Sequence, residues 1–527
     1  MTVKFQHIVF KIALLLSAIF LSKATAWAQS GVIELLPGTQ KLEYNEKTGA
    51  QKLVGGGINL NYEGNRVYAD SAYYYEARKL VKAFGHVQVT KNDSLNLYCD
   101  SLWYFTDTKK AKLFHNIRVI NDDYQLTTDF LDYDAHSGKA SYFTGGEIKN
   151  LTENETLTSV RGSLYPNQKR FHFSKNVQYR SDSLTMDTDT LQYDYRKKKV
   201  YFFGNTLICR DTTTMFCKNG WFQTEKQEGV LNDSAYVIQG GKSLFGDHLY
   251  INETEKMASG KGNVRFIDTT SHIETFSNIA FMSKKAQFGY ATDSLTVIYK
   301  MKKDTFYVHS DSILLFTDTA GKLVHAELFD DVQIYGTKMQ AACDSISLVK
   351  AENRMTLYRM PMVWSENSEL KGDTIQLFYN DSVITKAALF NNATAVMEID
   401  SGKYYNQVGG KRMDAYFQNN ELKQAYVAQN AQTNYFPQDT IRTDSTIEIQ
   451  RKGMARLSAS QIRVYLDSGE VVGVTYYKNP DGAFYPMAQI PADEQFIKNF
   501  AFTPQYRPTS PKDIYRKKRN YKSIKRK

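Results

Sequence analysis

The chain has 527 residues, of which 42% are hydrophobic and 13% aromatic, with 36 tyrosines, 30 phenylalanines and 10 prolines. That length is too great for one compact core, and the aromatic content favours pleated, half-buried strands. The formal net charge is +10, but residues 507–527 alone hold ten Lys or Arg and one acid. Without that tail and the first 28 residues the charge is about −2, which excludes a broadly basic, nucleic-acid-binding surface.

The N-terminus has the pattern of a secretory signal. Lys4 and Lys11 flank an apolar stretch, and small residues precede Gln29. We predict a signal peptide over residues 1–28, cleaved between Ala28 and Gln29. The apolar stretch is short for a membrane-spanning helix, so an uncleaved anchor is the weaker alternative.

Residues 29–61 form the predicted lead-in to the repeats. We expect a first strand at residues 31–36 and a bend at Gly55-Gly56-Gly57. No Lys-Ser/Thr pair and no helix start follow the glycines, so the pattern indicates a bend and not a phosphate-binding loop.

One pattern recurs over residues 62–396, and it is clearest at Leu95–Val119. There Cys99-Asp100-Ser101 precedes two alternating runs separated by the polar segment Thr106–Lys110. The aspartate returns at a spacing near 30 residues, and alternation within a fixed period predicts strands stacked as repeats. The recurring aspartates are Asp70, Asp100, Asp129, Asp189, Asp247, Asp311, Asp344 and Asp373.

These aspartates are expected to be corner residues. Asp followed by Ser or Thr bonds its own nearby backbone N–H groups, so we expect it to turn the chain from one strand into the next. A catalytic role is the alternative, but the carboxylates repeat with the fold and have no fixed acid, base or nucleophile beside them. A polysaccharide-active enzyme would need the fold to assemble them.

Alternation also assigns two faces to the strands. Intervening polar residues such as His86, Asn116, Arg118 and Gln333 are expected to face water, and apolar residues an interior. That interior is either a dry core or a groove for an apolar ligand. The candidate groove residues are Tyr74, Val87, Leu102, Tyr104, Ile117, Leu131, Tyr133, Leu191, Tyr193, Leu249, Ile251, Ile313, Leu315, Ile346, Leu348, Ile375 and Leu377.

The C-terminal quarter loses the regular pattern. Residues 397–479 have degenerate repeats with a polar insertion at 439–452, and strands are expected to end at Tyr477. Residues 480–527 hold six of the prolines and the basic cluster, which predicts an extended or disordered tail.

Cysteine and histidine give little sign of a reactive or metal site. The four cysteines contain no CxxC and the nine histidines are scattered, so we predict neither a metal nor a cofactor. Cys209 and Cys217 flank a turn and could form a disulfide in an oxidising compartment; small buried thiols are the alternative.

The units at Ala69–Val89 and Cys99–Val119 resemble the OstA-like repeat, which is shared by LptA and by the periplasmic part of LptD. The resemblance implies a non-enzymatic, elongated repeat β-jellyroll (β-taco) in the periplasm, associated with the outer membrane. Lipid A acyl chains of lipopolysaccharide would lie in its apolar groove. Implied partners are lipopolysaccharide, other Lpt-type jellyroll proteins through edge-strand pairing, and the outer-membrane translocon.

Two features depart from that family. The repeats are several times longer than in a typical LptA, and no long alternating-strand barrel of the LptD kind follows them. Two other classes therefore stay open: a structural or adhesive β-solenoid with a dry core, and a polysaccharide-active enzyme.

Overall fold

The computed structural model describes residues 33–37, 39–62, 65–91, 95–120, 124–165, 170–194, 196–223, 225–301, 304–380, 383–418, 421–442, 447–468 and 470–516. The predicted signal peptide and the basic residues after Arg516 lie outside these ranges. The chain forms two compact units, Met1–Ala258 (unit 1) and Ser259–Lys527 (unit 2).

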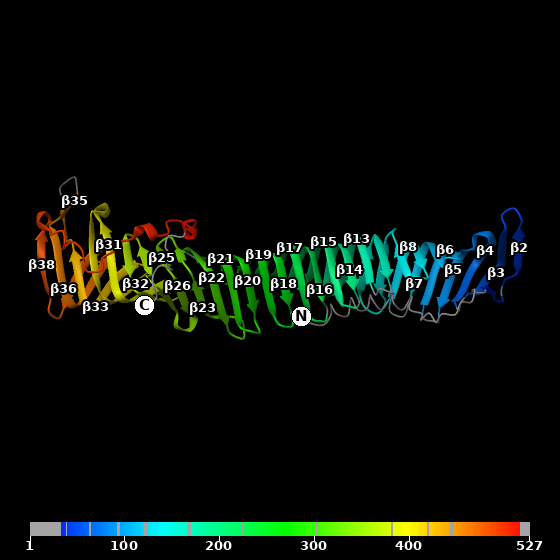
Figure 1. Cartoon of the computed structure of the whole chain (residues 1–527), viewed down its shortest axis with the longest axis horizontal. Helices are drawn as coiled ribbons and strands as arrows, with labels where there is room; N and C mark the ends of the chain where they lie inside the picture. Colours follow the sequence, from blue (N-terminus) through cyan, green and yellow to red (C-terminus); the bar gives the residue numbers. More distant parts are fainter. Residues whose placement is uncertain are drawn as a thin grey trace. The chain divides into compact units, whose positions relative to one another are not determined.

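Unit 1 is built from antiparallel strands, most of which pair with the strands before and after them in sequence (Figure 1). Its elements are β1 (Ile33–Leu35), β2 (Lys41–Asn45), β3 (Ala50–Tyr62), β4 (Asn65–Tyr75), η1 (Glu76–Arg78), β5 (Leu80–Lys91), β6 (Leu95–Phe105), β7 (Lys110–Ile120), β8 (Tyr124–Asp134), β9 (Lys139–Tyr142), β10 (Gly146–Asn150), β11 (Glu155–Ser159), β12 (Arg161–Tyr165), β13 (Arg170–Ser181), β14 (Leu184–Asp194), β15 (Lys199–Arg210), β16 (Thr213–Gln223), β17 (Glu228–Gln239) and β18 (Lys242–Asn252).

Unit 2 continues the same antiparallel pattern. Its elements are β19 (Met257–Asp268), which begins at the last residues of unit 1, β20 (Ile273–Ser283), β21 (Phe288–Lys300), β22 (Thr305–Thr317), β23 (Leu323–Phe329), β24 (Val332–Tyr335), β25 (Met339–Cys343), β26 (Ser345–Val349), η3 (Lys350–Glu352), β27 (Arg354–Tyr358), β28 (Met362–Ser365), β29 (Ser368–Lys371), β30 (Thr374–Asn380), β31 (Val383–Ile399), η4 (Asp400–Gly402), β32 (Tyr404–Gln418), β33 (Glu421–Tyr435), β34 (Gln438–Arg442), β35 (Ile447–Arg451), β36 (Gly453–Asp467), β37 (Glu470–Tyr477), β38 (Asp481–Pro486), η5 (Met487–Gln489), η6 (Pro504–Tyr506) and η7 (Asp513–Tyr515).

The prediction of an all-β repeat jellyroll is confirmed. The feature that shapes this fold is a bend in the middle of each long strand. Between β6 and β7 the register passes from Tyr98↔Arg118 to Ser101↔Phe114, so β7 has one residue more than β6 at this point. The extra length falls at His115 and Asn116, with φ of 59° and 50°. A bulge of this kind bends the strand, so its two halves enter different walls.

The bends divide each unit into two walls. In unit 1, wall A contains the second half of β6 with the first half of β7, and wall B contains their other halves. Where a bend interrupts a strand completely, short strands result: β9 and β12 lie in wall A, and β10 and β11 in wall B. In unit 2, wall A contains β23, β26, β27 and β30, and wall B contains β24, β25, β28 and β29.

The position of most corner aspartates corrects the sequence prediction. Asp100 lies in the middle of β6, so this corner turns the chain within one strand, and the same holds for Asp70, Asp129, Asp189, Asp247 and Asp311. The prediction holds for Asp344 and Asp373, which lie between β25 and β26 and between β29 and β30. The partner of Asp100 is also different from the expected one, because Asn116 Nδ2 of the next strand donates to Asp100 Oδ2 at 2.8 Å. At the preceding corner His86 Nδ1 lies 2.8 Å from Asp70 Oδ2, and this contact raises the pKa of His86.

Hydrogen bonds from a side chain to nearby backbone N–H groups occur instead at the turns between strands. Asp134 Oδ1 accepts from the N–H groups of His136 and Ser137 at 3.0 and 3.2 Å. Bonds of this type close the chain into a turn. The predicted chemistry therefore exists in this fold, but at strand ends.

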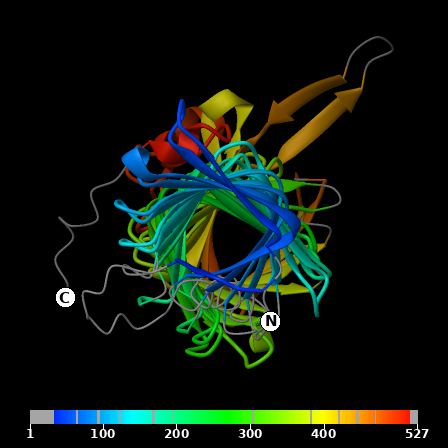
Figure 2. The ribbon, with the colours of Figure 1, turned by 90° about the vertical axis from the view of Figure 1, so that its right-hand side faces the viewer.

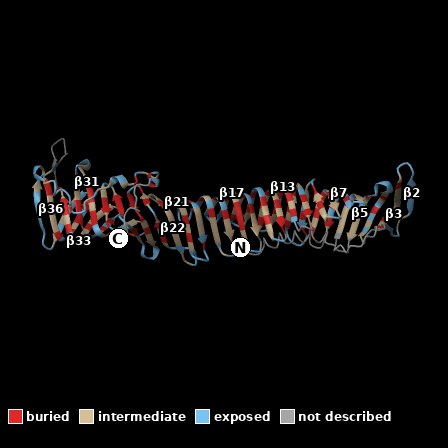
Figure 3. Cartoon of the chain, in the orientation of Figure 1, coloured by how far each residue is buried: buried red, intermediate tan, exposed pale blue. Residues whose placement is uncertain are grey.

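Alternation of burial holds along the strands (Figure 3). In β7, Ala111, Leu113, Ile117 and Val119 are buried, whereas Lys112 and its other neighbours are exposed or half-buried. This is the pattern of a wall with one apolar face and one solvated face.

The tail departs from the sequence prediction in two ways. A further strand, β38, lies beyond Tyr477, and residues 487–516 are placed as an extended segment with three short 3₁₀ turns. Residues 480–516 are therefore extended and ordered in this structure.

Residues 487–516 lie on the outer side of wall B in unit 2. Gln333 of this wall was expected to face water, but it is only 1% exposed.

The polar insertion near residue 440 forms the hairpin of β34 and β35, which is a separate two-stranded sheet. Figure 2 shows it, in orange, pointing away from the strands of unit 2. Arg451, the last residue of β35, donates from its guanidinium to Asp400 Oδ1 at 2.9 Å, which fixes the base of the hairpin.

Asn116→Val is predicted to destabilise the bend of β6 and β7. Valine loses the hydrogen bond to Asp100 and holds a β-branched side chain at positive φ, a conformation that costs an L-residue ~1–2 kcal/mol. Native-state hydrogen exchange should show protection in β6 and β7 reduced by about 2 kcal/mol, with β17 and β18 unchanged. Asn116→Gly is the control, because it loses only the hydrogen bond. Equal losses in the two variants would contradict the conformational explanation.

The apolar interior as the candidate binding site

The inner faces of unit 1 meet in one apolar cluster that extends from β4 to β15. Leu113 and Ile117 of β7 are each 1% exposed, and Leu131 of β8 is 2% exposed. Each removes its aliphatic surface from water, which stabilises the stacked strands by roughly 1.5–3 kcal/mol per side chain.

Aromatic rings fill the middle of this interior. Tyr142 of β9 is 1% exposed, and its hydroxyl lies 2.7 Å from Ser159 Oγ. Gly162 makes room for the ring, because a Cβ there would approach it to 2.3 Å. Burial raises the pKa of Tyr142 to about 12, so its hydroxyl stays protonated at neutral pH.

Other inner-face residues of unit 1 keep partial exposure. Leu102, Tyr104 and Tyr133 pack against the main cluster in half-buried positions. Leu244 and Ile251 of β18 do the same against a smaller cluster around Leu249. These side chains therefore keep part of their apolar surface exposed.

Threonines line the inner side of the bends. Thr188 Oγ1 lies 2.8 Å from Thr206 Oγ1, and Thr206 donates to the Gly204 carbonyl at 3.0 Å. Thr128 donates to the Gly145 carbonyl at 2.7 Å. These hydroxyls satisfy carbonyls near the bends, so the threonines are hydrogen-bonded where they are buried.

The interior of unit 2 combines fully buried and half-buried side chains. Leu357, Ile375 and Leu389 are 0% exposed, whereas Leu315 and Leu348 pack against the cluster in half-buried positions. A cavity of about 50 Å³ lies between residues such as Val408 and Val464. That volume holds a few waters at most and not a fatty acyl chain.

Every predicted groove residue lies in a buried or half-buried position, and whether any of them contacts lipid stays a prediction. The buried ones are Val87, Ile117, Leu131, Leu191, Tyr193, Leu249, Ile313, Ile346, Ile375 and Leu377. The half-buried ones are Tyr74, Leu102, Tyr104, Tyr133, Ile251, Leu315 and Leu348.

The left-handed pairs at the bends are the structural residues that the sequence interpretation missed. Their second member is often asparagine, as at Asn116, Asn176, Asn392 and Asn430. Asparagine tolerates positive φ better than most residues. Its recurrence in the companion strands is the signal that could have located the bends.

Carboxylates at the bends act as clamps between neighbouring strands. At two bends the residue types are exchanged relative to Asp100 and Asn116: the left-handed residue is Asp233 or Asp293, and it accepts from Asn219 or Asn278 at 2.7 Å. Within the described ranges, no group of three or more His, Cys, Asp or Glu is placed to hold a metal ion.

The cysteines are free thiols. The register pairs Cys209 with Thr214 and Cys217 with Thr206, so the two thiols do not face each other across β15 and β16. Burial raises the pKa of Cys99 to about 12 and that of Cys217 to about 11. The alternative of small buried side chains therefore fits three of the four, and Cys209 is half-exposed.

Residues 33–189 match the model of the family described as OstA-like protein. The match covers less than a third of the chain, and it says what this segment is similar to. The matched segment extends from β1 into β14 and contains the half-buried inner residues Leu102, Tyr104 and Tyr133.

A solved structure with similarity to the chain is LptH from Pseudomonas aeruginosa, described as the LptA-homologous periplasmic component of the lipopolysaccharide transport device. The identity is 14%, the match covers 27% of this chain and 79% of that chain, and the TM-score is 0.14. These values are too low to carry a structural argument. No curated protein sequence matches the chain. Among the residues the structure describes, no helix is long and apolar enough to cross a membrane.

Thiol reactivity should separate Cys209 from the other cysteines. A thiol with a pKa of 11 or 12 is no more than about one-thousandth thiolate at pH 8, and the thiolate is the reactive form. Iodoacetamide labelling followed by mass spectrometry should modify Cys209 at least ~10-fold faster than Cys99, Cys217 and Cys343. Cys209→Ser should abolish the fast reaction. Labelling of Cys99 at the rate of Cys209 in the folded protein would contradict the burial described here.

Proposed function

We propose that this protein is a periplasmic, non-enzymatic bridge that binds lipopolysaccharide and helps to deliver it to the outer membrane. Lipid A acyl chains would lie between the two walls, against the inner faces of the strands. The observation that carries the proposal is the match of residues 33–189 to the OstA-like family. The bent strands of this segment enclose an apolar interior with half-buried side chains.

Binding of this kind needs no reaction chemistry. Each acyl methylene that leaves water contributes ~0.8 kcal/mol, so a few chains are held firmly by apolar contact alone. The threonine hydroxyls inside unit 1 bond main-chain or side-chain oxygens, so they leave few polar groups to oppose an acyl chain. The phosphorylated sugars would stay outside, where the side chains are polar.

The first and last strands support pairing with other jellyroll proteins. Among the described strands, β1 and β2 each pair only with β3, and β37 and β38 each pair only with β36. Unpaired strand edges are ready sites for addition of another strand. An Lpt-type jellyroll protein at one edge and the outer-membrane translocon at the other would make a continuous path.

A structural solenoid with a dry core is the second candidate, and the packing of unit 2 favours it there. Leu357 and Ile375 are fully buried, and the cavity beside this region is too small for an acyl chain. A polysaccharide-active enzyme is less well supported, because the corner carboxylates are separate and each described clamp engages an Asn, His or Arg.

Photo-crosslinking in cells tests lipid binding. Probes at Leu102 and Tyr104, which are half-buried on the inner face, should form lipopolysaccharide adducts. A probe at Trp103, between them on the outer face, should form none, and a probe at the fully buried Ile375 should form at least ~10-fold fewer adducts. Absence of adducts at Leu102 and Tyr104 in a folded, abundant protein would leave the dry solenoid as the better account.

A further inference from the structure

The C-terminal segment 494–516, here called the strap, lies along the outer side of wall B in unit 2. It follows β38 and passes back over the wall strands in reverse order (red segment in Figure 1). Apart from its short 3₁₀ turns it has no regular structure and takes no part in a strand ladder. Wall side chains hold it in place.

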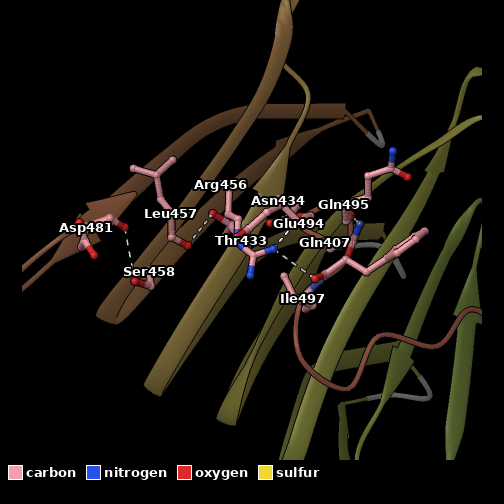
Figure 4. Close-up of polar contacts among 11 residues, drawn as sticks. Gln407, Thr433, Asn434, Arg456, Leu457, Ser458, Asp481, Glu494, Gln495 and Ile497 are labelled. Carbon is pink, nitrogen blue, oxygen red and sulfur yellow. Dashed lines mark hydrogen bonds and ion pairs between the residues drawn. The ribbon is translucent and has the colours of Figure 1, made fainter. Parts of the chain in front are cut away.

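The first contacts of the strap are to its main chain (Figure 4). Gln407 Nε2 donates to the Gln495 carbonyl at 2.9 Å, and Gln407 Oε1 accepts from the Ile497 N–H at 3.0 Å. Asn434 Nδ2 donates to the Glu494 carbonyl at 2.9 Å. Gln407 and Asn434 are 4% and 0% exposed, so these polar groups depend on the strap for partners.

Further along the strap, a buried carboxylate repeats this pattern. Glu369, 1% exposed, accepts from the Thr503 N–H at 2.9 Å and from the Thr503 hydroxyl at 3.1 Å. Trp364 Nε1 also donates to Glu369, at 2.7 Å. Beside it, Lys371 Nζ donates to the Ala501 carbonyl at 2.8 Å.

Apolar contacts accompany the hydrogen bonds. Ala342, Met362 and Trp364, all on the outer face of wall B, form a buried cluster against Tyr506 of the strap. Ile514, near the strap's end, is 0% exposed. Without the strap this cluster would lie open as an apolar patch on the outside of the sheet.

These contacts describe a track for an extended peptide. Wall side chains bind the peptide's carbonyl and N–H groups, and the apolar cluster takes the ring of Tyr506. The wall also contacts strap side chains: Tyr405 packs against Phe500 and Phe502, and Gln340 accepts from Arg507 at 2.7 Å. The strap leaves the track without loss of any strand pairing, because it follows the last strand. The strap's own sequence already fits the track, so an identical segment from another chain fits it equally well.

We propose that wall B of unit 2 is a docking surface for the strap of a second copy of this chain, and that the chain's own strap normally occupies it. A chain's own strap competes with the strap of a second copy for wall B. Because it is tethered, its effective concentration is about millimolar, so a single copy with its own strap bound is the default state. Exchange between copies becomes possible when that strap is released, as in domain swapping. The proposal does not depend on lipid binding.

Disulfide trapping between full-length chains tests the exchange. One chain carries Ala501→Cys in the strap and the other carries Lys371→Cys in the wall, two positions in direct contact. After mixing and mild oxidation we expect a covalent dimer of mixed composition. Adding Thr503→Ala to the second chain weakens the hold of its own strap on the wall that must accept the first chain's strap. This change and a higher protein concentration should each increase the yield of the mixed dimer by about threefold or more.

Two controls make the result decisive. A single chain with both cysteines should close an internal disulfide, which shows that the geometry permits the bond. Ala501→Cys mixed with Lys112→Cys, an exposed position in unit 1, should give only background dimer. The proposal would be overturned if the single chain closes its internal disulfide but the mixture gives no mixed dimer above that background at any concentration tested.

Discussion

The pair of left-handed residues in the middle of each companion strand is the constraint on which the rest of the structure depends. A strand of regular pleat would continue in one sheet, and its inner face would need a separate layer to cover it. The bend at His115 and Asn116 instead folds the strand onto its own neighbours. Two walls are thus made from the strands of one chain, and each clamp between aspartate and asparagine holds a bend in register with the next.

This construction also fixes the width of the interior. Because both walls come from the same strands, their separation is set by the side chains between them and not by an independent layer. Large rings such as Tyr142, with glycine opposite, fill the interior of unit 1 near β9, whereas Leu102 and Ile251 leave apolar surface partly exposed. Under the proposed function, an acyl chain would enter only where the walls separate or where side chains are half-buried.

Alternation with a period of two was enough to predict the strands and the inner face, whereas the family resemblance came from the units at Ala69–Val89 and Cys99–Val119. Pairs such as Leu113 and Ile117 carry that signal in the sequence directly. The bends were misplaced because an aspartate that clamps a neighbouring strand has the same sequence signature as one that closes a turn. Gln333 was misassigned because its burial depends on a segment nearly two hundred residues away, and no local pattern reports such a contact.

The strap explains why the strands of wall B in unit 2 lose their alternation. In β25 all five residues are buried, since Met339 and Ala341 face the interior while Gln340 and Ala342 face the strap. Buried polar groups on that outer face are stable only while their hydrogen bonds are made. The strap thus ties wall strands together across their ladder.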